Sequence, residues 1–118
     1  MSRLILLNSA IMPAEGVYCL RRIDKDDVKI NIDIAKADHQ LVSYLNPRHE
    51  DLISFVEREF GLPKDIHQPA FWQPEDGDVA IVIKPLKPTR SGEELSNIEY
   101  EFYLVTYYEG WPQFNQED

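Results

Sequence analysis

The segment 46–63, NPRHEDLISFVEREFGLP, carries the clearest structural pattern in the chain and decides the fold class. Its apolar residues recur at helical spacing and would form one face, which comprises Leu52, Ile53, Phe55, Val56 and Phe60. Asn46 is a favourable N-cap that precedes a first-turn proline, and Gly61 with Pro63 would end the helix. The pattern therefore predicts one main amphipathic helix over residues 47–60.

Short apolar runs on both sides of this helix predict strands. These runs are residues 3–8, 17–23, 41–45, 70–72, 78–84 and 99–108. Because Pro13 and Gly16 break the chain between the first two runs, we expect those two to pair as a hairpin with a wide loop. The simplest packing is an α/β fold, a single mixed sheet of about five strands with the main helix and any smaller helices packed on it.

The segment 24–36 allows two interpretations. Asp24 would be a good N-cap for a helix that starts at the next residue. However, apolar residues in this segment alternate with polar residues or alanine at strand spacing, at Val28, Ile30, Ile32 and Ile34. The alternation favours a strand over residues 28–34, with a short helix as the alternative.

Length and charge restrict the classes of protein. The chain has 118 residues, 43% of them hydrophobic, and a formal net charge of −9, which fits one folded domain. We expect residues 1–109 to form that domain and residues 110–118 to be a polar tail. The negative charge argues against binding along long nucleic acids, which needs a basic face. No apolar run approaches the ~20 residues that span a bilayer, so we expect a cytoplasmic protein without a membrane anchor.

The residues that most often bind metals do not form a recognisable motif. Cys19 is the single cysteine, and its place in a predicted strand favours a buried, unreactive thiol. His39, His49 and His67 lack the close spacing of a zinc site, and the sequence contains no phosphate-binding glycine loop and no nucleophile elbow. We therefore expect neither a bound metal nor a cofactor.

His49 is the candidate catalytic residue, and it lies at the start of the predicted main helix between Arg48 and Glu50. A helix N-terminus offers free N–H groups and a positive potential to a phosphate. A histidine there can transfer a proton near neutral pH, and the adjacent arginine can contact phosphate oxygens. The alternative is an exposed histidine at a helix start that has no role.

Two further groups of residues are candidates for ligand binding. Lys84, Lys87 and Arg90 form a basic set around a proline-broken loop, for which a simply solvated loop is the alternative. Asn8 and Ser9 follow the first predicted strand, and strand ends are where α/β sheets place ligand contacts. An Asn-Ser pair is also ordinary in turns, so this group has a structural alternative too.

Three motifs resemble one protein family. The opening at residues 6–13, LLNSAIMP, with Gly16 and Tyr18 after it, is similar to that of the small viral and mobile-element ring nucleases known as type III anti-CRISPR proteins. Residues 99–104, EYEFYL, resemble the last strand of that family. Residues 41–43, leading to His49 and its following glutamate, resemble the family's strand and its Gly-His-(Asp/Glu) motif at the start of a helix.

The resemblance implies a homodimer that binds a cyclic oligoadenylate, cyclic tetra-adenylate in this family, across its two-fold axis and cleaves it without a metal. A ribose 2′-OH would attack its own 3′-phosphate and leave a linear product with a 2′,3′-cyclic phosphate. His49 falls where the family has its catalytic histidine, and it would protonate the leaving 5′-oxygen as the general acid. Such a protein would antagonise or switch off type III CRISPR signalling.

Three positions depart from the family pattern. Arg48 stands where the family has a glycine before the histidine, and Pro88 and Ser91 stand where it has a loop arginine and a loop glutamate. Lys87 and Arg90 replace that arginine only if the loop shifts. Two alternatives therefore stay open: a sponge or sensor that binds the nucleotide without cleaving it, and a protein-interaction module.

Overall fold

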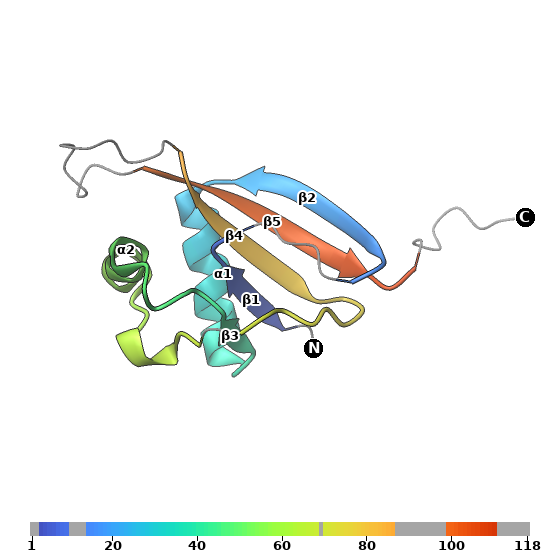
Figure 1. Cartoon of the computed structure of the whole chain (residues 1–118), viewed down its shortest axis with the longest axis horizontal. Coiled ribbons are helices and arrows are strands. Elements are labelled where there is room, and N and C mark those ends of the chain that lie inside the picture. Colours follow the sequence, from blue (N-terminus) through green and yellow to red (C-terminus); the bar gives the residue numbers. More distant parts are fainter. Residues whose placement is uncertain (1–2, 10–13, 69, 87–98, 111–118) are drawn as a thin grey trace, which may run out of the picture.

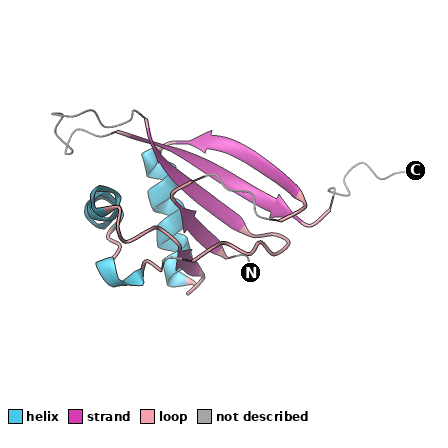
Figure 2. Cartoon of the chain, in the orientation of Figure 1, coloured by secondary structure: helices cyan, strands magenta, loops and turns pink. Residues whose placement is uncertain are grey.

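Five strands form one mixed sheet, and both helices pack on the same face of it (Figures 1 and 2). The strands are β1 (Leu4–Leu7), β2 (Val17–Ile23), β3 (Leu41–Ser43), β4 (Val79–Pro85) and β5 (Tyr100–Tyr108). The helices are α1 (Lys25–Ala37) and α2 (Glu50–Phe60), and one 3₁₀ turn, η1, spans Lys64–Ile66. This computed structural model describes residues 3–9, 14–68, 70–86 and 99–110. The predicted α/β class with a single mixed sheet is confirmed.

The sheet is built from distant parts of the chain. Its strand order is β2-β5-β4-β1-β3, with β1 parallel to both β3 and β4. β5 is antiparallel to its two neighbours, and every residue of β2 pairs with it. The predicted hairpin of the first two strands is wrong, because β5 and β4 lie between β2 and β1. β1 is buried along its whole length, and a central strand of this kind needs a neighbour on each side.

α1 replaces the strand that was expected at residues 28–34. Asp24 caps the helix, because its carboxylate accepts a hydrogen bond from the Asp27 N–H at 2.9 Å. Only Val28, Ile32 and Ala35 of α1 are buried, whereas Ile30 and Ile34 are 56% and 58% exposed. The strand-like alternation therefore came from two isoleucines on the outer side of a helix.

α2 begins at Glu50, three residues later than predicted. Asn46 does not cap the helix; its side-chain oxygen accepts a hydrogen bond from the Arg48 N–H at 2.9 Å and closes a local turn. His49 occupies the N-cap position instead and makes no side-chain capping bond. Gly61 ends the helix as predicted, in the left-handed conformation with a φ of 68°.

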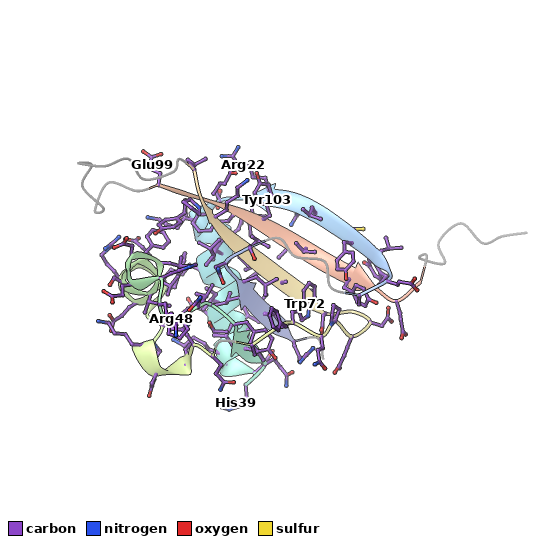
Figure 3. All side chains as sticks on the ribbon, in the orientation of Figure 1. Arg22, His39, Arg48, Trp72, Glu99 and Tyr103 are labelled. Carbon is purple, nitrogen blue, oxygen red and sulfur yellow. The ribbon has the colours of Figure 1, made fainter. Side chains whose placement is uncertain are left out.

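The opposite face of the sheet is covered by aromatic side chains rather than by a helix. Trp72, labelled in Figure 3, is 3% exposed and packs there with Tyr18 and Tyr107. Residues 70–72 do not form the predicted strand, because this segment crosses the face instead of joining the ladder. The thiol of Cys19 is exposed, contrary to the prediction, because the middle of β2 lies at the open edge of the sheet.

Two remaining expectations concern the tail and the membrane. Residues 111–118, nearly all of the predicted polar tail, lie outside the described residues. Within the part of the chain that the structure describes, neither helix is long and apolar enough to cross a bilayer.

Candidate functional site

The parallel strands bring the candidate site together at one edge of the sheet. Because β1 runs parallel to β3 and β4, the carboxyl ends of all three strands lie at the same edge. Asn8 follows β1 directly, and residues 44–49 connect the end of β3 to the start of α2. Ligand contacts in α/β sheets are usually placed at such an edge.

The Asn8 and His49 side chains meet at this edge although they are far apart in the sequence. The Asn8 Nδ2 lies 3.5 Å from the His49 Nδ1, at the outer limit of a hydrogen bond. An amide that donates to Nδ1 favours the tautomer in which Nε2 carries the proton. The His49 ring is solvent-exposed, so this second nitrogen is accessible to a ligand.

The start of α2 adds positive potential to the same place. His49 accepts the first helical hydrogen bond through its carbonyl, from the Ile53 N–H at 3.0 Å. The N–H groups of the next three residues have no partner inside the helix, and they can bind an anion. Glu50 and Asp51 lie in the first turn and stabilise the helix, but their charges compete with a phosphate for this potential.

Arg48, the residue before His49, carries a guanidinium next to the candidate site. Its backbone is held by the turn at Asn46, whereas its side chain is exposed and takes part in no ion pair with the residues that the structure describes. Ser9, directly after Asn8, is also exposed. The structure therefore gathers five of the predicted residues at one edge: Asn8, Ser9, Arg48, His49 and Glu50.

The basic set is not gathered in the same way. Lys84 lies near the carboxyl end of β4, but it is two residues after Val82 and so shares the face of Val82, on the side of the sheet opposite the helices. The contact between Asn8 and His49 lies at the helix side, since His49 starts α2. Lys87 and Arg90 lie outside the described residues.

The other two histidines lie apart from His49. His39, labelled in Figure 3, is exposed just beyond α1 in the left-handed conformation, with a φ of 58°. His67 is buried, and its Nδ1 lies 2.6 Å from the Ser43 Oγ. Burial lowers the pKa of His67, and its Nε2 contacts no polar partner among the described residues. Because Ser43 and His67 are only 3% and 5% exposed, this pair braces β3 rather than meeting a substrate.

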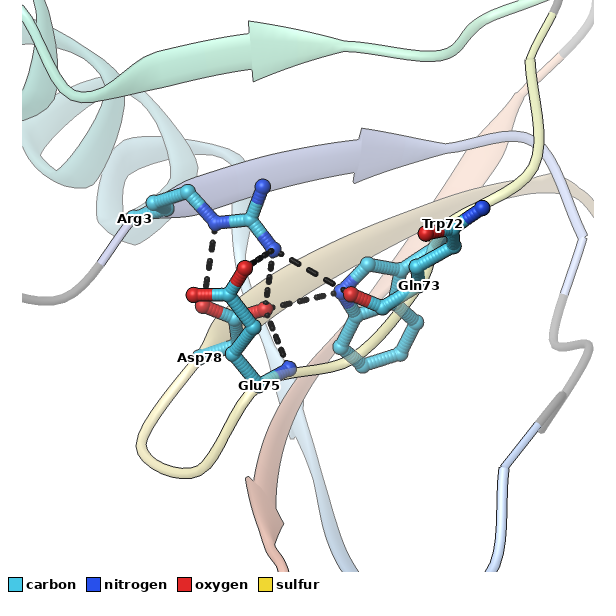
Figure 4. A network of polar contacts seen from close by, with 5 residues as sticks. All are labelled: Arg3, Trp72, Gln73, Glu75 and Asp78. Carbon is cyan, nitrogen blue, oxygen red and sulfur yellow. Dashed lines mark hydrogen bonds and ion pairs between the residues drawn. The ribbon is translucent and has the colours of Figure 1, made fainter.

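A second polar cluster that the sequence analysis missed lies at the amino ends of β1 and β4 (Figure 4). Asp78 is 3% exposed, and it accepts hydrogen bonds from Arg3 Nη2 at 2.6 Å, Trp72 Nε1 at 3.1 Å and the Glu75 N–H at 2.9 Å. Burial alone would raise the pKa of Asp78, but these hydrogen bonds outweigh it and the pKa lies below its ordinary value. Because Asp78 is buried and its oxygens are occupied by these donors, the cluster ties the amino ends of β1 and β4 to Trp72.

A hollow of about 420 Å³ also opens beside α2, and Phe55 and Tyr100 contribute to its lining. Its basic residues are already engaged: Arg22 lies 3.7 Å from Glu101, and Lys25 lies 2.9 Å from Glu59. Within the described residues, no three histidine, cysteine or acidic side chains gather as metal ligands would. The basic residues of this hollow are therefore less available to a ligand than Arg48 beside His49.

The fold and the site define a small α/β domain with a helix N-terminus, a histidine and an amide side chain at the carboxyl edge of its parallel strands. The sequence matches no family model and no curated protein. The fold is similar to the solved structure of B116 of Sulfolobus turreted icosahedral virus, with a TM-score of 0.69 and 17% sequence identity. The match covers 88% of this chain and 98% of B116. The chain therefore shares its fold with a small viral protein.

Proposed function

We propose that the protein is a metal-independent ring nuclease that binds and cleaves a cyclic oligoadenylate, with cyclic tetra-adenylate as the first substrate to test. The observation that carries this proposal is the contact between Asn8 and His49. The two residues come from separate motifs that resemble the ring nucleases, and the fold brings them to one edge although 41 positions separate them. The activity would lower type III CRISPR signalling in the cytoplasm.

The chemistry needs a proton donor and a stabiliser of negative charge. When a ribose 2′-OH attacks the adjacent 3′-phosphate, the 2′-oxygen bonds to phosphorus and releases its proton to water, while the P–O5′ bond breaks and the leaving 5′-oxygen takes up a proton. His49 supplies that proton from the exposed Nε2 of its imidazolium form, and the Asn8 amide holds the ring when its oxygen is turned toward the protonated Nδ1. Arg48 and the N–H groups of α2 stabilise the negative charge that develops on the phosphorane.

A symmetric ligand would meet the residues around His49 twice in a two-fold assembly. We propose a homodimer in which a two-fold axis places one His49 from each copy against the ring. Sedimentation with and without ligand tests this part of the proposal. A monomer at micromolar concentration under both conditions would contradict it.

The decisive experiment compares His49→Ala with a control at another exposed histidine. His39→Asn is the matched control, because asparagine tolerates the left-handed backbone at that position. We expect His49→Ala to slow formation of the linear 2′,3′-cyclic phosphate product by roughly 10²–10⁴-fold and to leave ligand affinity nearly unchanged. His39→Asn should cleave like the wild type. Equal rates for His49→Ala and the wild type would refute the assignment of the general acid.

A binding function without cleavage is the second candidate. The first turn of α2 carries Glu50 and Asp51 beside the proposed phosphate site, and their charges oppose the charge of a phosphorane. A sponge or sensor would bind the cyclic nucleotide in a thermal-shift assay and return it intact. The viral protein-interaction module predicts no cyclic-nucleotide affinity, so the same assay separates the three functions.

A further inference from the structure

α1 carries an apolar ridge on the side that faces away from the sheet. Ile30 and Ile34 are four residues apart, so their side chains lie one above the other on the helix. They are 56% and 58% exposed, and Ala37, one turn further on, is exposed as well. The buried side of α1 is formed by other residues, so packing within this domain does not account for these two isoleucines.

Four carboxylates surround this ridge. Asp26 and Asp27 lie one helical turn before Ile30, and Asp33 lies one turn after it. Asp38, the C-cap residue, lies one turn after Ile34. Only the Asp33 carboxylate has a cationic partner within the described residues, Lys29 at 3.2 Å. The ridge is therefore an apolar strip inside an acidic ring.

Two of the three lysines of α1, Lys25 and Lys36, are turned away from the ridge, toward α2, whereas Lys29 pairs with Asp33. Lys25 Nζ lies 2.9 Å from a Glu59 carboxylate oxygen on α2. Lys36 Nζ donates to the carbonyl of Gly61, just beyond α2, at 3.4 Å. Two lysines therefore lie at the seam between the helices, and three carboxylates without an ion-pair partner among the described residues, Asp26, Asp27 and Asp38, lie around the isoleucines.

We infer that this ridge is a docking surface for a basic amphipathic helix of a partner protein. Leucine-like side chains of such a helix would pack on both sides of Ile30 and Ile34, as helical ridges pack into grooves. Lysine or arginine side chains at its borders would reach Asp26, Asp27 and Asp38, and the charge of −9 on the whole chain would favour the approach.

The same charges exclude the other common occupants. A second copy docked by the same surface would bring two rings of carboxylates together, which costs free energy. Nucleic-acid backbones and anionic lipid headgroups would be repelled for the same reason. The surface is separate from the contact between Asn8 and His49. The inference therefore adds a protein partner to the proposed nuclease and does not concern its nucleotide site.

A synthetic peptide tests this surface directly. The probe is a fluorescein-labelled helical peptide of about 18 residues, with leucines on one face and lysines on the other. Its affinity for the full chain is measured by fluorescence anisotropy. Ile30→Ser with Ile34→Ser should weaken binding at least about tenfold, because the buried apolar area is lost. Asp27→Asn with Asp38→Asn should weaken binding about three- to tenfold, and added salt should reduce this difference.

Matched controls separate docking from general attraction to an acidic protein. Leu20→Ser removes an exposed apolar side chain from β2, and Asp65→Asn with Glu109→Gln removes the same number of charges elsewhere. Both controls should bind within about twofold of the wild type. Circular dichroism verifies that every variant folds, since serine at exposed helix positions costs little.

Three results would overturn the inference. The first is a wild-type protein that does not bind the peptide at about 100 μM. The second is equal weakening by the ridge variants and their controls, which indicates general electrostatic attraction. The third is a wild-type dimer that dissociates when Ile30 and Ile34 are replaced, which makes the ridge a contact between copies. The first two results would leave cyclic-nucleotide cleavage unchanged, so the inference can fail while the proposed function stands.

Discussion

Replacing Asp78 with alanine should strongly destabilise the fold. The carboxylate is 3% exposed and accepts hydrogen bonds from Arg3, from the Trp72 indole and from the Glu75 N–H. Without it, the buried Trp72 and Glu75 donors lose their partner, and each such loss costs about 1–3 kcal/mol. The side chain of Arg3 is 28% exposed and can regain water, so its loss adds less. We expect a total loss of about 3–5 kcal/mol.

The expected loss converts into a measurable shift in melting temperature. A chain of 118 residues unfolds with an entropy of about 0.25 kcal/mol/K, if each residue contributes about 2.1 cal/mol/K. Asp78→Ala should therefore lower the melting temperature by roughly 12–20 °C in a circular dichroism scan. Urea unfolding at fixed temperature gives the free energy itself.

A matched variant and a pH series complete this test. Glu75→Gln removes only an ion pair of 4.0 Å at a side chain that is 75% exposed, and it should cost less than about 0.5 kcal/mol. Because the folded-state pKa of Asp78 is lowered, its contribution is present above the unfolded pKa and is lost as the pH falls through the folded pKa. Asp78→Ala should therefore lose less stability in acid than the wild type. A loss below about 1 kcal/mol at neutral pH would refute the cluster's structural role.

Three smaller predictions concern other parts of the fold. Burial lowers the pKa of His67 below its ordinary 6.5, so its contribution to stability should be fully present above pH 6.5 and be lost as the pH drops through the folded pKa. His67→Gln should flatten the dependence of the unfolding free energy on pH. Identical pH dependence in the variant and the wild type would contradict the lowered pKa of His67. Gly61→Ala should cost about 1 kcal/mol in urea unfolding, because φ is 68° and no atom lies within 4 Å of the added methyl; Gly110→Ala, with no such constraint, is the control. Lys25→Ala should cost less than about 1 kcal/mol in urea unfolding, because the ion pair of Lys25 and Glu59, at 2.9 Å, is exposed to solvent. A larger loss would contradict this exposed character of the pair.

The sequence predicted an element correctly where burial alone determined the spacing of its apolar residues. The apolar face of α2 and its terminal Gly61 were both identified, because a buried helix face imposes its spacing on the sequence. α1 was missed because Ile30 and Ile34 are apolar yet exposed. Their spacing reflects something other than burial in this domain, and sequence periodicity cannot separate the two causes.

Strand pairing was decided only by tertiary structure. The run at residues 4–7 predicts a buried strand, but its sequence does not indicate which strands pair with it. Its partners β3 and β4 come from distant segments and lie parallel to it, while the nearby β2 pairs with β5. Parallel strands need a crossover connection, and the connection from β1 to β3 includes α1. The sequence pattern of α1 had favoured a strand instead.

For the candidate site too, the sequence identified residues and the tertiary structure decided which of them lie together. The sequence by itself identified Asn8 and His49 as separate candidates, because a strand end and a helix start each expose polar groups. Only the tertiary structure decided that they meet, since the parallel arrangement of β1 and β3 carries both to one edge. It also decided that Lys84 faces the other side, because strand residues alternate between the two faces of the sheet. Local chemistry is encoded residue by residue, whereas proximity depends on which strands pair.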